Sequence, residues 1–304
     1  MGRRAQCTVG AARGWGEKTC WSADPFGVYR ACMLAWHNGT IIPYEEAHVH
    51  VSDLGLLRAY AVFDYLRTFG GRPFRLHDHL ARFRNSAAGL GIPLRFANEQ
   101  IAAAIDELLA RNPLEECAFR LVLTGGHSPD SMTISDPNFF ILAERLPEYD
   151  PVCYTEGVKL ITSEFLRDVP TVKSTGYLNA IRLAPIVREH GAHDMLYCHE
   201  GRVLELTRNN FFLFHGDTLA TPSDDVLHGI TRKVVLELCR GAFPVEERDV
   251  RTDELRAATE AFLCGTTKGV MPVVRIDDFV VGEGRVGENT RRVMELFGAY
   301  TARK

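Results

Sequence analysis

A Schiff base with an aldehyde requires a primary amine, which a guanidinium group cannot replace. The chain holds only six lysines: Lys18, Lys159, Lys173, Lys233, Lys268 and Lys304. Two of them lie near the termini and a third lies in a predicted strand. Of the other three, we take Lys173, in the stretch VKSTGYLNAI, as the best candidate for a covalent anchor.

A glutamate in the later stretch GRVLELTRNNFFLF complements this lysine. A pyridine cofactor acts as an electron sink only while its ring nitrogen keeps a proton, so the protein must place an anion beside that nitrogen. Glu205 can supply this anion. A glutamate in an apolar strand has a raised pKa unless a cation such as a pyridinium compensates it. Taken alone, Glu205 also fits a water-facing hairpin edge.

Two glycine-threonine turns are suited to binding a phosphate group. Gly229 precedes Ile230 and Thr231, which open an apolar-periodic run, so their amides would begin a helix and point at an anion. Thr266 and Thr267 follow the run AFLCG and would add a hydroxyl and free amides. Such pairs also commonly cap helices. Together with the lysine and the acid, they indicate a pocket for pyridoxal phosphate.

From about Met33 onward, the chain resembles the class IV (fold-type IV) pyridoxal phosphate aminotransferases. This group includes branched-chain aminotransferases, D-amino acid transaminases and aminodeoxychorismate lyase. The matching segments are AVFDYLRTFGGRPFRLHDHLARFRNSA, FRLVLTGG, VKSTGYLNAI, ELTRNNFF, HGITR and CGTTKGVMPV. The resemblance implies a two-domain α+β fold and a transaminase that uses pyridoxal 5'-phosphate, an amino acid and a 2-oxo acid.

The resemblance also implies roles for single residues. Lys173 would carry the cofactor and move the substrate proton, Tyr177 would bind the phenolic oxygen, and Glu205 would pair with the ring nitrogen. The other cofactor-binding residues would be Arg82, Asn210, Ile230, Thr231 and Thr266. The substrate-binding residues would be Arg58, Phe63, Tyr65, Arg120 and Thr267.

The substrate pattern departs from that of branched-chain members. Those enzymes usually carry tyrosine and glycine where this chain has Arg58 and Ala59, and glycine where it has Tyr65. Arg58 and Arg120 would suit a carboxylate, and Tyr65 would narrow the side-chain pocket. This favours D-amino acids such as D-alanine or D-glutamate, although the usual D-specific pattern has arginine at the position of Gly125.

Several alternatives remain open at this stage. The enzyme would instead be an L-branched-chain aminotransferase if the two arginines hold the side-chain carboxylate of L-glutamate. An aminodeoxychorismate lyase would use the same lysine to eliminate pyruvate. Arg58 also fits a surface or interface position, and Arg120 fits a salt bridge at a strand end.

Charge and composition argue against several classes of binding partner. The net charge of −4 and the pI near 6.3 give no footprint for nucleic acid or an anionic membrane. Eight scattered cysteines predict reduced thiols in a cytoplasm and show no metal-ligand spacing. No apolar run approaches a membrane span. The resemblance implies a homodimer in which the loop before AVFDYLR reaches the partner's pocket.

The predicted organisation has two domains. Residues 1–32 lack periodicity and are interpreted as a disordered or misassigned extension. Residues 33–145 form a small α+β domain that starts with hairpins at Asn38-Gly39 and Gly70-Gly71. Its two helices would be capped by Asp78 and Asn98. Residues 146–153 form the linker, and residues 154–304 form a larger α+β domain with helices over 177–190, 230–240 and 288–303.

Overall fold

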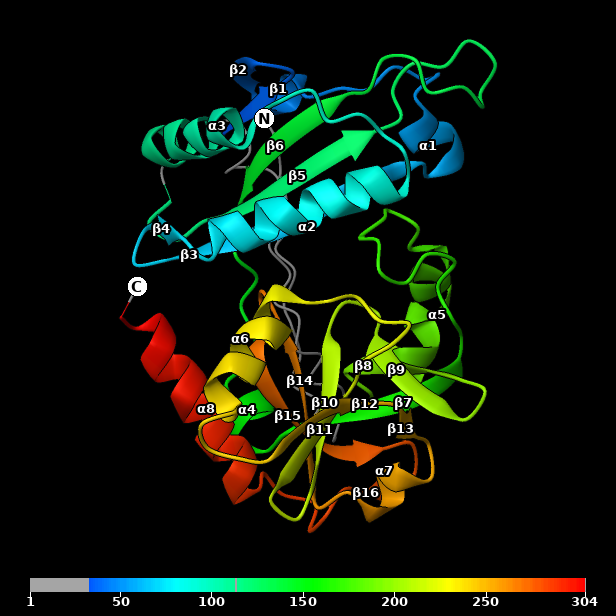
Figure 1. Ribbon diagram of the computed structural model, residues 1–304, viewed down its shortest axis with the longest axis vertical. Coiled ribbons are helices and arrows are strands. Elements are labelled where there is room, and N and C mark those ends of the chain that lie inside the picture. Colours follow the sequence, from blue (N-terminus) through cyan, green and yellow to red (C-terminus); the bar gives the residue numbers. More distant parts are fainter. Residues whose placement is uncertain (1–32, 113, 304) are drawn as a thin grey trace, which may run out of the picture.

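Two β-sheets with their own helices make up the part of the chain that the structure describes. The computed structural model describes residues 33–112 and 114–303, so the interpretation of residues 1–32 lies outside the described residues. Figure 1 shows the smaller sheet in the upper half and the larger sheet in the lower half. The α+β fold class is confirmed, whereas the exact domain and linker boundaries stay a prediction.

The smaller sheet is antiparallel throughout, in the order β2-β1-β6-β5-β3-β4. Both predicted hairpins are confirmed. Asn38 and Gly39 connect β1 to β2, and Gly70 and Gly71 connect β3 to β4, all four with positive φ as tight two-residue turns require. The strands are β1 (Leu34–His37), β2 (Thr40–Pro43), β3 (Ala61–Phe69), β4 (Arg72–Pro73), β5 (Ala118–Thr124) and β6 (Phe139–Glu144).

Three helices accompany this sheet: α1 (Leu54–Arg58), α2 (Leu76–Gly89) and α3 (Asn98–Arg111). The predicted caps are wrong. Helix α2 starts directly from the β4 hairpin, with Arg75 as its N-cap, so Asp78 lies in the first turn and binds Lys233 instead. Helix α3 is preceded by Ala97, which places Asn98 one residue inside the helix. The apolar faces of both helices pack inward, through Phe83 and Ile105 among others.

The larger sheet is mixed, in the order β12-β11-β10-β14-β15-β7-β8-β9-β13, with β16 beside β15. Its strands are β7 (Val158–Glu164), β8 (Asp194–His199), β9 (Arg202–Leu206), β10 (Asn210–His215), β11 (Thr218–Pro222), β12 (Val245–Arg248), β13 (Val250–Arg251), β14 (Glu260–Gly265), β15 (Gly269–Ile276) and β16 (Phe279–Val280). Its helices are α4 (Val152–Thr155), α5 (Leu178–Glu189), α6 (Ile230–Cys239), α7 (Glu254–Ala257) and α8 (Glu288–Thr301). The three long helices thus agree with the predicted ranges, and α5 continues past Pro185.

The two halves are joined along β3. The Phe63 amide donates to the Lys173 carbonyl oxygen at 2.9 Å, and the Thr175 amide donates to the Ala61 carbonyl oxygen at 3.0 Å. From the larger sheet, the Thr266 hydroxyl donates to the Tyr65 carbonyl oxygen at 3.3 Å. The segment that carries the candidate lysine therefore belongs to the second half in sequence but is held by a strand of the first.

Candidate active site

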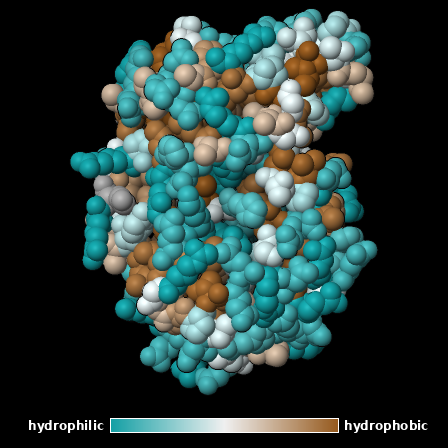
Figure 2. Space-filling model, in the orientation of Figure 1, coloured by the Kyte–Doolittle hydropathy of each residue, from teal (hydrophilic) through white to brown (hydrophobic). Residues whose placement is uncertain are grey.

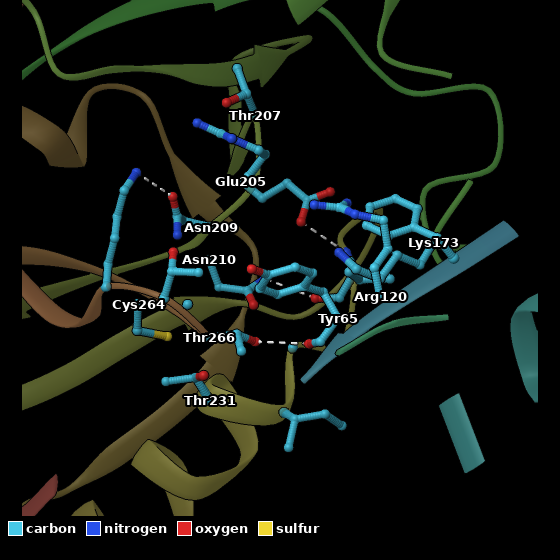
Figure 3. Close-up of a pocket in the computed structure, with 18 of the residues that line it drawn as sticks. Tyr65, Arg120, Lys173, Glu205, Thr207, Asn209, Asn210, Thr231, Cys264 and Thr266 are labelled. Carbon is cyan, nitrogen blue, oxygen red and sulfur yellow. Dashed lines mark hydrogen bonds between the residues drawn. The ribbon is translucent and has the colours of Figure 1, made fainter. Parts of the chain in front are cut away.

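A cavity of about 500 Å³ lies where the two sheets meet. Figure 3 shows Lys173, Glu205, Thr231 and Thr266 lying around it, although they come from distant parts of the chain. Arg58 is the exception among the predicted residues, because it lies outside this cavity at the exposed end of α1. The predicted residues that line the cavity are Phe63, Tyr65, Arg82, Arg120, Lys173, Tyr177, Glu205, Asn210, Ile230, Thr231, Thr266 and Thr267.

Lys173 has the properties of a reactive amine. Burial and the nearby guanidinium of Arg82 lower its pKa to about 7. Its Nζ lies 4.5 Å from the centroid of the Phe63 ring. Among the described residues, no group forms a hydrogen bond with this Nζ. Near neutral pH a large fraction of the amine is therefore unprotonated and available to attack a carbonyl carbon.

The other two candidate lysines are held by protein groups. The buried Lys268 donates to the Asn209 side-chain oxygen at 2.9 Å and lies 3.6 Å from the Asp194 carboxylate. Lys233 is half-exposed in its side chain and binds Asp78 at 2.6 Å. Both amines therefore have structural partners, which supports Lys173 as the anchor.

Glu205 does not face water, so the hairpin-edge interpretation is wrong. The side chain is buried, and burial raises the pKa of Glu205 while Arg167 opposes this rise. The Arg167 Nε donates to Glu205 Oε1 at 2.9 Å, and its Nη2 donates to the same oxygen. The Leu227 amide donates to Oε2 at 3.1 Å. A buried carboxylate supported in this way can hold a protonated ring nitrogen opposite it.

Sequence reasoning missed Arg167. Besides binding Glu205, Arg167 donates from Nη1 to the carbonyl oxygen of Val172, the residue immediately before Lys173, at 3.0 Å. Arg167 thus orients the Glu205 carboxylate and also holds the backbone immediately before Lys173. In the sequence, Arg167 is only an arginine within a loop, and nothing near it indicates that Glu205 on β9 is its buried partner.

Two buried side chains that sequence reasoning missed, Asp64 and His79, orient Arg82. Its Nε and Nη2 each donate to the Asp64 carboxylate at 2.8 Å, and His79 Nδ1 lies 2.7 Å from the same carboxylate. These partners hold the pKa of Asp64 well below its usual range. Desolvation lowers the pKa of His79, so its neutral ring donates from Nδ1. The signal for this unit is an aspartate inside the apolar run AVFDYLR.

The phosphate side is formed at the N-terminus of α6. Gly229 is the N-cap, and no side chain caps the first amides of this helix, so those of Ile230 and Thr231 are free to meet an anion. Asn210 supports this turn, since its Nδ2 donates to the Leu227 carbonyl oxygen at 2.8 Å. A Cβ at position 229 would lie 2.1 Å from Asn210 Oδ1, so only glycine fits there.

The opposite wall carries the residues predicted to bind substrate. Arg120 lies with its Cζ 4.7 Å from the centroid of the Tyr65 ring, and its guanidinium is bound by Glu144. The Thr267 hydroxyl lies 3.0 Å from the Tyr149 hydroxyl. Burial raises the pKa of Tyr177, which keeps its hydroxyl protonated as a donor.

This set of donors fits pyridoxal phosphate. A low-pKa amine, a buried carboxylate and an uncapped helix N-terminus match an aldehyde, a ring nitrogen and a phosphate, respectively. The family model "Amino-transferase class IV" matches residues 61–276. The chain belongs to the class IV aminotransferases.

Relatives and solved structures agree with this family. The chain is 33% identical to a Methanocaldococcus jannaschii protein named as a candidate branched-chain-amino-acid aminotransferase, covering 87% of this chain and 95% of that protein. It is 30% identical to the D-alanine aminotransferase of Bacillus licheniformis, covering 86% and 94%. The branched-chain amino acid aminotransferase of Thermobaculum terrenum, solved in its PLP-form, superposes with a TM-score of 0.80 at 26% identity, covering 90% and 95%.

This class IV aminotransferase therefore uses pyridoxal 5'-phosphate and transfers amino groups. When bound, the cofactor withdraws electrons from the substrate α-carbon and makes its proton acidic. Glu205 would hold the ring nitrogen, and Arg82, Thr231 and Thr266 would hold the phosphate. Lys173 Nζ would anchor the aldehyde carbon and then carry the α-proton.

Two further findings concern membrane spans and metal ions. In the described ranges, no helix is both long and apolar enough to cross a membrane. No group of three or more His, Cys, Asp or Glu side chains within residues 33–112 and 114–303 is placed to bind a metal ion.

Proposed function

We propose that this enzyme transfers the amino group of an L-branched-chain amino acid to a 2-oxo acid in a ping-pong reaction. The low-pKa Lys173 opposite a buried Glu205 carries the transaminase part of this proposal. The named relatives support the branched-chain part more than the D-amino acid preference expected from Arg58 and Arg120. The wall around Lys173 also includes the apolar side chains of Phe63 and Ile181.

The arginine pair gives the D-specific alternative limited support within one chain. Arg120 is already bound by the Glu144 carboxylate, and Arg58 donates to the neighbouring Leu57 carbonyl oxygen. Arg120 therefore already has a carboxylate partner, and Arg58 lies outside this chain's own cavity, so the two guanidiniums do not converge on one substrate α-carboxylate within one chain. The D-alanine aminotransferase relative keeps D-amino acid transamination as the second candidate.

Half-reactions with single amino acids test the substrate proposal. We expect L-leucine and L-valine to convert the cofactor of the holoenzyme from its aldehyde to its amine absorbance in a single turnover. Fast conversion by D-alanine and none by L-leucine would contradict the L-branched-chain proposal and support D-amino acid transamination instead. Pyruvate release from aminodeoxychorismate, without any amino acceptor, would reveal the lyase.

We further propose a homodimer that shares its active sites. Leu56 on α1 and Leu178 and Ile181 on α5 are 60%, 80% and 71% exposed, and Figure 2 shows apolar surface on this side of the molecule. Large apolar groups exposed together on one side indicate an interface. In such a dimer, Arg58 at the end of α1 would reach the partner's pocket.

A mixed dimer tests this arrangement. If Arg58 acts in the partner's pocket, a dimer of one Arg58→Ala subunit and one Lys173→Ala subunit regains one competent site of two, because that site combines intact Lys173 with the partner's intact Arg58. We expect activity in the mixed dimer well above that of either parent homodimer. Sedimentation of the wild-type enzyme as a fully active monomer would contradict the proposal.

A further inference from the structure

Arg120 and Glu144 form a closed ion pair in the wall of the pocket. Arg120 Nε donates to Glu144 Oε1 at 2.7 Å, and Nη2 donates to Oε2 at 2.9 Å. Both residues line the cavity. This side-on, two-bond geometry is the one a substrate carboxylate would use on a guanidinium. The protein's own carboxylate therefore occupies the donors that an acidic substrate needs.

The local structure explains why these two side chains meet. Arg120 lies opposite Leu142, and Glu144 lies opposite Ala118 in the β5–β6 ladder, so Arg120 and Glu144 are diagonal neighbours on one face of the sheet. The Tyr65 ring, opposite Arg120 on β3, lies against the guanidinium. The register of the β5–β6 ladder and the contact with the Tyr65 ring thus hold the forked Arg120 guanidinium where Glu144 can bind it.

We propose that Glu144 is a specificity-determining residue that makes the pocket select amino and 2-oxo acids with neutral side chains over those with acidic ones. This inference rests on the proposed function, because it concerns the substrates of the same site. With a neutral side chain bound, Arg120 keeps its partner and the charges of this ion pair stay balanced. An acidic side chain must either displace Glu144 from Arg120, which leaves the Glu144 carboxylate uncompensated, or lie beside the closed ion pair without the two-bond contact to Arg120. Both arrangements cost binding energy.

Binding of unreactive acids to the holoenzyme tests the inference without turnover. Glutarate and 4-methylvalerate serve as acidic and neutral probes and are titrated by the change in cofactor absorbance. We expect the wild-type enzyme to bind 4-methylvalerate at least about tenfold more tightly than glutarate, the worth of one charge-assisted contact. In Glu144→Gln, which frees the Arg120 fork, glutarate should bind about ten- to a hundredfold more tightly than in wild type.

The matched control is Glu148→Gln, which removes the same charge from an exposed position that does not line the pocket. It should keep the wild-type ratio of the two dissociation constants. Equal binding of both acids by wild type would overturn the inference, as would unchanged glutarate binding in Glu144→Gln. If Glu144→Gln does not fold, Glu144→Ala, which also frees the Arg120 fork, takes its place in the same titration.

The same proteins separate this inference from the proposed function. The ratio of kcat/KM for 2-oxoglutarate to that for 4-methyl-2-oxopentanoate should rise in Glu144→Gln in parallel with glutarate binding. If no amino acid changes the cofactor spectrum, the proposed function fails, while the glutarate titration still reports on Glu144.

Discussion

Lys173→Ala should abolish covalent attachment of the cofactor and lower the half-reaction rate by at least about a hundred- to ten-thousandfold, the usual worth of a positioned proton carrier. No other lysine in the described ranges can take over. Lys268 is buried against Asn209 and Asp194, and Lys233 is bound to Asp78. Borohydride reduction and peptide mapping of the wild-type enzyme should label residue 173. A label on Lys268 would reject the assignment.

The pH dependence of cofactor capture gives a second measurement for the same lysine. Attack on an aldehyde needs the unprotonated amine, and burial lowers the pKa of Lys173 to about 7. The rate of attachment to the apoenzyme should therefore rise with pH up to about 7 and level off above it. A rate that keeps rising toward pH 10 would show an ordinary lysine. Lys233→Ala, on the surface of α6, should behave as wild type.

Glu205→Gln should keep the fold and most of the affinity for the cofactor, while it slows α-proton transfer by about a hundred- to a thousandfold. The amide has nearly the same shape but no charge, so it cannot keep the ring nitrogen protonated. Affinity should fall less, because the phosphate donors at α6 are unchanged. The measurement pairs a cofactor titration with a single-turnover half-reaction followed with α-deuterated substrate.

A control for this prediction is Glu148→Gln, an exposed glutamate outside the pocket. It should keep wild-type rates, which would show that loss of one negative charge alone is not the cause. Wild-type proton transfer in Glu205→Gln would instead assign the buried pair of Glu205 and Arg167 a purely structural role.

Residues whose chemistry depends on a short motif could be predicted from the sequence. The threonine turns at 231 and 266 are examples, because glycine, hydroxyl and amides are close in the chain. The hairpin at Asn38-Gly39 could be predicted equally well, because a tight turn needs two residues with positive φ and few residue types other than Asn and Gly adopt them. The resemblance of several ordered segments supplied the fold and the roles that we propose for Lys173 and Glu205.

Partners that meet only through tertiary packing could not be predicted. Arg167 lies 38 residues before Glu205, and Glu144 lies 24 residues after Arg120, so neither pairing has a local signal. Strand β12 has no clear strand signal either, because VEER carries three charges, which is typical of an edge strand. The cap at Asp78 was wrong because the preceding hairpin, rather than the helix pattern, sets where α2 begins.

Strand β3 holds three separate parts of the site. Its backbone holds the lysine segment at Phe63, its Asp64 side chain aims Arg82, and its Tyr65 carbonyl oxygen receives Thr266. The mutual spacing of Lys173, Arg82 and Thr266 is therefore set by consecutive residues of a single strand, so a substitution that bends β3 would misplace groups from three distant parts of the sequence at once.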